Sequence, residues 1–234
     1  MDRHAVHYLP ILTTALSAVF CIVLLRAAMV RRSGPHLWWW AAGVFFYGLG
    51  TALESTVTLG GNSVALTKAW YIAGALLGGY PLAQGVAYLL LHGKIANLLA
   101  IVTLAVVALA SLAVILSPAD LSQLEPHRPT GAVIAWKAVR WTTPLINLYA
   151  FVLLVGGAAW SARRYAGSPE TRHRAVGNAF IAVGALLPGV GGAMAKGGLV
   201  EALYVGECVG LILIWIGYGI IAARHRASRG PAPQ

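Results

Sequence analysis

The sequence predicts an all-α, polytopic membrane protein with seven transmembrane helices. Hydrophobic residues make up 59% of the 234 residues, and charged residues only 10%, whereas soluble domains are about 25% charged. The apolar residues also form runs of about 20, the length that crosses the hydrocarbon of a bilayer, and the arginines lie between the runs. Because an open sheet would leave its edge groups unpaired in lipid, such runs are expected to be helices.

The predicted spans form one transmembrane domain, residues 1–226, and no block of polar composition suggests a soluble catalytic domain. The short tail at 227–234 contains proline and glycine and is expected to be disordered. The seven spans are 8–29, 37–59, 66–91, 95–116, 141–161, 175–196 and 203–223.

Basic residues favour one side of the predicted membrane. One set of connections contains eleven basic residues, ten of them arginines, and a single acid, Glu170. The other set mixes six basic residues with acids such as Asp120 and Glu125. The positive-inside rule places the first set in the cytoplasm, which leaves the N-terminus outside and the C-terminus inside. We therefore interpret the net charge of +10 as membrane topology in a cell inner (plasma) membrane. Lipids are the expected surroundings, and nucleic acid is not an expected partner.

The second and third spans resemble the sixth and seventh, as in Gly48–Leu53 and Gly189–Met194. Parallel repeats occur among membrane transporters, so the likeness predicts a 3+1+3 plan with the fourth span as linker. The alternative is that small residues recur because they let helices approach closely in lipid. Pro81, Pro144 and Pro188 are expected to kink the third, fifth and sixth spans.

The longest connection, residues 117–140, is expected outside the membrane. It opens with Ser117-Pro118-Ala119-Asp120, which is typical of a turn and a helix start. The apolar segment Val133–Val139 predicts a short helix lying on the membrane surface.

Four ionisable residues lie within or at the ends of spans, where a charge costs several kcal/mol unless it meets water or a partner. Glu54 and Glu207 lie in the second and seventh spans, Lys68 opens the third, and Lys196 closes the sixth. All four are expected in the outer half of the membrane. We infer an outward-facing polar pocket with the two glutamates as acids and the lysines as counter-charges. The alternative is interfacial residues that reach water or pair between helices.

Helical spacing adds neutral side chains to this pocket, because residues three, four or seven apart share a helix face. Thr51 shares a face with Glu54, Tyr71 with Lys68, and Tyr204 with Glu207. No Cys/His spacing typical of a metal site and no catalytic motif is present. The predicted ligand-binding residues are Glu54, Glu207, Lys68, Tyr71, Thr51, Asn147, Tyr149, Tyr204 and Lys196.

Two resemblances bear on function. The helix count, the topology and the segment Arg140–Leu145 resemble a microbial rhodopsin, but the last span lacks the lysine that would bind retinal, and Thr142-Thr143-Pro144 falls in the fifth span rather than the third. Retinal is therefore not expected, and no other cofactor is indicated. Leu37–Glu54, Lys68–Tyr71 and Gly79–Leu82 resemble the seven-helix sensor module of bacterial histidine kinases.

The resemblance to the sensor module implies a stand-alone sensor or receptor for an unknown small ligand. Since no kinase follows, it would act through a cytoplasmic signalling partner or as a homo-oligomer. A small-solute or proton-coupled transporter is the alternative, favoured by the repeat, the prolines and the paired acids. An intramembrane enzyme acting on lipids ranks third, because the sequence shows no HExxH or GxSxG motif.

Overall fold

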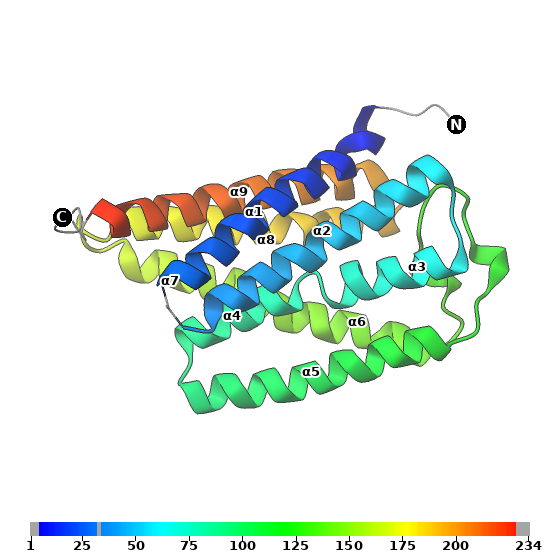
Figure 1. Cartoon of the computed structure of the whole chain (residues 1–234), viewed down its shortest axis with the longest axis horizontal. Helices are drawn as coiled ribbons and strands as arrows, with labels where there is room; N and C mark the ends of the chain where they lie inside the picture. The colour runs from blue at the N-terminus through cyan, green and yellow to red at the C-terminus, as the bar shows by residue number, and fades with distance from the viewer. Residues whose placement is uncertain (1–4, 32–33, 228–234) are drawn as a thin grey trace. The chain divides into compact units, whose positions relative to one another are not determined.

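The computed structural model describes residues 5–31 and 34–227 (Figure 1). Within these ranges the secondary structure is helical, and the only β-type pairing is an isolated bridge between Ala119 and Ile134. The predicted all-α class is therefore confirmed. The predicted disordered tail lies, from residue 228 onward, outside the described residues.

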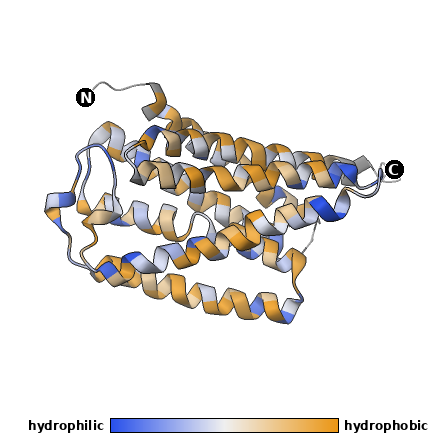
Figure 2. Cartoon of the chain, turned by 180° about the vertical axis from the view of Figure 1, so that it is seen from behind, coloured by the Kyte–Doolittle hydropathy of each residue, from blue (hydrophilic) through white to orange (hydrophobic). Residues whose placement is uncertain are grey.

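Among the described residues, six helical segments are long and apolar enough to cross a membrane, so the chain is a multi-pass membrane protein. Figure 2 shows apolar residues covering these helices, with hydrophilic residues concentrated near their ends and in the connections. The six segments are Leu9–Val30, Val64–Leu90, Gly93–Leu116, Lys137–Tyr165, Arg172–Ala195 and Val200–Ala223.

Helix α2 (His36–Gly60) covers the second predicted span, 37–59, but is not among these six. It contains Glu54, Ser55 and three threonines, which lower its hydropathy. Most of these polar residues are buried, because α2 packs against α1 (Leu9–Arg31) on one side and α4 (Tyr80–Leu90) on another. A helix enclosed by protein does not need a fully apolar surface. The most apolar stretch of α2 accordingly has a lower mean hydropathy than those of the six segments.

The chain divides into two compact units, Met1–Leu153 and Leu154–Gln234, and each is described here by itself. The first unit contains α1 to α6. The second contains α7 (Gly157–Tyr165), α8 (Arg172–Lys196) and α9 (Val200–Ala227). The boundary falls inside a π-helical segment, Phe151–Gly156, in the fifth apolar run.

The third apolar run is broken rather than kinked. It consists of α3 (Val64–Trp70), a π-helix (Tyr71–Leu76) and α4, and the chain leaves helical geometry at residues 77–79. Pro81 lies in the first turn of α4, where a missing N–H costs nothing. Instead of kinking a continuous helix, Pro81 therefore lies where a new helix begins. Pro144 and Pro188, by contrast, lie inside α6 and α8.

The core of the first unit lies among the π-helix, α4, α5 (Gly93–Leu116) and α6 (Lys137–Ala150). Tyr71, Leu76 and Tyr80 contribute from the broken run, Val107 and Val114 from α5. On the opposite side α2 approaches the broken run at glycines, since a Cβ on Gly50 would lie 2.9 Å from the Cα of Gly74. Small residues thus permit backbone contact between these segments.

The connection between α5 and α6 is folded, but it does not contain the surface helix predicted at Val133–Val139. It forms two short 3-10 turns, Leu121–Gln123 and Gly131–Val133, and α6 begins only at Lys137. Val133 and Ile134 are both fully buried. Burial of these apolar side chains against the first unit stabilises an irregular connection more than a lipid-facing helix would.

In the second unit, α8 and α9 pack along a seam of glycines. A Cβ on Gly184 would lie 2.6 Å from the carbonyl oxygen of Gly210, and one on Gly177 would lie 2.8 Å from that of Gly217. The spacing of seven residues on both helices keeps the seam facing the partner helix. This seam brings the backbones of α8 and α9 close together, and it depends on residues without side chains.

Candidate ligand site

Glu54 is a buried acid of the first unit, with only 3% of its surface exposed. It lies on α2 four residues after Gly50, which meets the π-helix, and three after Thr51, whose hydroxyl lies 2.9 Å from that of Thr14 on α1. At about 100° per residue, the Glu54 side chain falls between these two directions. Its position is therefore at the junction of α1, α2 and the broken run.

This part of α2 carries several hydroxyl side chains. Thr51, Ser55 and Thr58 are buried, and each donates a hydrogen bond to a backbone carbonyl of the preceding turn. Such bonds satisfy a hydroxyl without a partner helix and often bend the helix locally. Thr51 therefore contributes a polar side chain three residues before Glu54, on the side of α2 that faces α1.

Lys68 binds backbone carbonyls rather than a carboxylate in the described contacts. Its ammonium group donates to the carbonyl oxygens of Ile115, at 2.8 Å, and Ser117, at 2.6 Å. These carbonyls belong to the last turn of α5 and to the residue after it, which have no partner within the helix. A cation at a helix C-terminus also interacts favourably with the helix dipole. Lys68 therefore caps α5 and joins it to α3.

Tyr71 connects the broken run to α6 and to the connection above it. Its hydroxyl lies 2.6 Å from that of Thr143, and a Cβ on Gly131 would lie 2.7 Å from its ring. The α5–α6 connection therefore rests directly on Tyr71. Tyr71 lies three residues after Lys68, and both side chains contact the α5–α6 connection.

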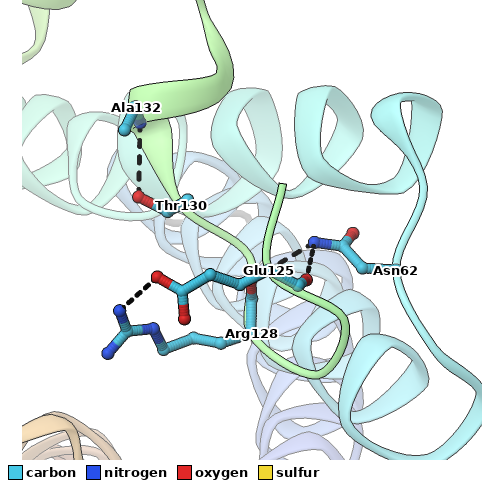
Figure 3. Close-up of polar contacts among 5 residues, drawn as sticks. All are labelled: Asn62, Glu125, Arg128, Thr130 and Ala132. Carbon is cyan, nitrogen blue, oxygen red and sulfur yellow. Dashed lines mark hydrogen bonds and ion pairs between the residues drawn. The ribbon is translucent and has the colours of Figure 1, made fainter. Parts of the chain in front are cut away.

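Asn62 is a further residue of this region, and the sequence argument missed it. Its amide donates to the carbonyl oxygens of Glu125 and Arg128 (Figure 3). Its own side-chain carbonyl accepts a hydrogen bond from the Thr67 hydroxyl. Glu125 and Arg128 form an ion pair in the same turn. A single side chain thus attaches the α5–α6 connection to the turn between α2 and α3. The signal available in the sequence was only an asparagine in a short turn, which is common.

Tyr149 joins a different cluster. Its hydroxyl donates to the side-chain carbonyl of Gln84, 2.6 Å away, and the Gln84 amide donates to the carbonyl of Ala96 near the start of α5. Gln84 is fully buried, and the Tyr80 ring packs against the rings of both Tyr149 and Trp39. This cluster lies near the α4–α5 turn, whereas Lys68 lies at the other end of α5. Asn147, two residues before Tyr149, is exposed.

The remaining predicted residues belong to the second unit. Tyr204 is buried and Glu207 half-buried on α9, three residues apart and therefore on one face. Lys196 ends α8. The structure thus groups Glu54, Thr51, Lys68 and Tyr71 in one unit, and the pairing of Glu54 with Glu207 stays a prediction.

Outside the apolar spans, His36 has a shifted pKa. His36, at the start of α2, packs edge-on against Trp40 with ring centroids 5.4 Å apart. Burial lowers the pKa of His36 from its ordinary value of 6.5, because desolvation disfavours the imidazolium. Among the described residues, no group of three or more His, Cys, Asp or Glu side chains is arranged to hold a metal ion.

Comparison with known proteins adds no relative. A scan against protein-family models, a search of curated proteins and a search of solved structures each found no match to the chain. The class that the fold defines is therefore that of an all-α, multi-pass membrane protein, and function has to be argued from its own side chains.

Proposed function

We propose that the chain is a seven-helix protein of the inner (plasma) membrane whose first unit binds a small ligand from outside the cell and acts as a sensor or receptor. The observation that carries the proposal is the burial of Glu54 within α2, at 3% exposure. A carboxylate at membrane depth is costly, and proteins retain one chiefly where it binds or relays something.

The seven-helix topology is part of this proposal. Helix α2 has 25 residues, about 37 Å at the usual rise of about 1.5 Å per residue, which is ample for a bilayer core. Counting it as a span makes the total odd and puts the N-terminus outside, in agreement with the basic connections inside. The 3+1+3 repeat is retained as a hypothesis within this topology.

The surroundings of Glu54 favour a ligand with a cationic or hydrogen-bond-donating group. Thr51 contributes a hydroxyl on the α1 side. Tyr71 is the first residue of the π-helical segment that packs next to α2. The α5–α6 connection lies over Tyr71 and is attached through Asn62 and Lys68. A ligand that reaches Glu54 from outside would alter these attachments, which offers a route from binding to helix rearrangement.

The test uses the full chain in nanodiscs and a panel of small amines, amino acids and quaternary ammonium compounds. A compound that binds the native state should raise the free energy of unfolding with the logarithm of its concentration, by about 2.7 kcal/mol at a hundred times its dissociation constant. Glu54→Gln should remove that response, and Glu170→Gln, an exposed acid in the α7–α8 turn, should keep it. An unchanged response in Glu54→Gln would contradict the proposal.

A transporter is the second candidate, and the broken third run is the observation that favours it. Discontinuous helices form substrate sites in many transporters, where half-helix ends and unwound backbone contact the cargo. Here the break at residues 77–79 lies between the π-helix and α4. Saturable counterflow in liposomes, lost on Glu54→Gln, would support transport, and binding without any flux would favour the sensor.

A further inference from the structure

Three exposed arginines flank the short turn between α7 and α8 in the second unit. Arg163 and Arg164 end α7, and Arg172 begins α8. Within the part of the chain that the structure describes, none of these three arginines makes an ion pair of the kind that joins Arg128 to Glu125. The end of α7 is correspondingly hydrophilic (Figure 2). We call Arg163, Arg164 and Arg172 the basic turn cluster.

Apolar side chains lie one helical turn deeper on the same faces. Trp160 precedes Arg163 and Arg164 by three and four residues and is 65% exposed. Val176 follows Arg172 by four residues and is 42% exposed. Residues at these spacings lie above one another on a helix. Both helices therefore present a cation toward the membrane surface and an exposed apolar group below it, and tryptophan is enriched at that depth.

The turn holds the cluster in place. The Thr171 hydroxyl donates to the carbonyl oxygens of Tyr165, at 2.9 Å, and Ser168, at 3.3 Å. Arg174 lies over the Tyr165 ring, with its guanidinium carbon 5.5 Å from the centroid. These contacts connect the two helix ends, so the arginines are presented from a preformed turn and little order has to be gained on binding.

A second feature of this corner is the polar environment at the start of α8. The Nδ1 atom of the half-buried His173 is shielded from solvent and has no hydrogen-bond partner among the described residues. Thr171 directs its hydroxyl back toward the turn and does not cap α8, a helix of 25 residues. The first turn of α8 thus keeps donors available next to the arginines, in an arrangement that suits an anion.

We propose that the basic turn cluster binds the headgroup of an anionic phospholipid from the adjacent leaflet. Arg163, Arg164 and Arg172 would contact the phosphodiester, since guanidinium groups match phosphate oxygens in paired hydrogen bonds. An acyl chain would lie against Trp160 and Val176. Basic clusters next to transmembrane helices commonly recognise anionic lipids. The proposal depends only on the second unit being in a membrane, not on the ligand site of the first unit.

The test measures lipid binding to the full detergent-purified chain by native mass spectrometry, with phosphatidylglycerol, cardiolipin and phosphatidylcholine as probes. The triple variant R163Q/R164Q/R172Q removes the cluster. A control triple variant, K94Q/K137Q/R140Q, removes the same charge from exposed positions in the first unit. We expect the cluster variant to bind the anionic lipids at least about tenfold more weakly than the wild type. The control variant should bind them like the wild type.

Two further arms make the result decisive. The variant R163K/R164K/R172K keeps the charge, so it should fold and retain preference for anionic lipid at reduced affinity. Inorganic phosphate at millimolar concentration should not displace the lipid, because it lacks the acyl chains that contact Trp160. Equal weakening in both triple variants would overturn the proposal, as would equal binding of phosphatidylcholine. Full displacement by phosphate would instead indicate a soluble anion and would also overturn it.

Discussion

Substitution of Gly184 by alanine tests whether glycine contacts hold the second unit together. Gly184 and Gly192 both lie inside α8, but a Cβ on Gly184 meets the backbone of α9, whereas one on Gly192 meets nothing within 4 Å. Alanine is a better helix former than glycine by about 0.5–1 kcal/mol. Gly192→Ala should therefore be neutral or slightly stabilising.

The expected cost at Gly184 follows from the distance. Its Cβ would lie 2.6 Å from the Gly210 carbonyl oxygen, and ordinary contact begins at 3.4 Å, so α8 and α9 must separate by roughly 0.8 Å (3.4 − 2.6). A gap of about 0.5–1 Å forfeits a quarter to a half of the dispersion energy of the contacts along the seam. Overpacking of this kind costs about 1–3 kcal/mol. The helix-propensity gain offsets only part of that.

The assay is the free energy of unfolding in mixed micelles, measured by helix content against denaturing detergent, for the wild type and the two variants. Gly184→Ala should be less stable than Gly192→Ala by about 2 kcal/mol. If the two variants unfold together, the close packing of α8 on α9 does not contribute as argued. A loss at Gly192 alone would contradict the reasoning even more directly.

Two other predictions concern the first unit. Tyr149→Phe should lower the free energy of unfolding by about 1–3 kcal/mol, because it leaves the buried Gln84 carbonyl without its hydrogen bond. Tyr165→Phe is the control. Equal stability of the two variants would refute the contribution of the Gln84 contact. The lowered pKa of His36 means that the unfolded chain binds more protons below about pH 6.5. Stability should therefore be complete above that pH and decline as the pH falls below it. His36→Gln should weaken this decline and His92→Gln, at an exposed position, should not; the reverse pattern would count against burial as the cause.

Much of the helical architecture follows from the sequence, because lipid permits few alternatives. Apolar runs of about 20 residues must satisfy their own backbone groups, and only helices do so within one segment. Helix α5, for example, was expected at 95–116 and is observed at Gly93–Leu116. Helix α2 shows the limit of this argument, since its hydropathy is reduced by polar residues that packing conceals.

The candidate site was less accessible to sequence reasoning. Glu54 could be singled out because an acid in an apolar run is rare, and helical spacing placed Thr51 near it. Lys68 was assigned as a counter-charge on the same grounds, yet its ammonium group contacts the carbonyls of Ile115 and Ser117. Spacing defines which residues share a face of one helix, but it does not define which element covers that face.

The sequence by itself therefore determined the class of this protein, the all-α multi-pass membrane type, and the approximate extent of its helices. Only the tertiary structure decided where the third run breaks, how Asn62 attaches the α5–α6 connection, and that Gln84 joins α4, α5 and α6. The physical reason is one of range. Hydropathy and helical hydrogen bonding act within a single segment, whereas side-chain partners come from segments far apart in the chain, and their contacts exist only once the helices have packed.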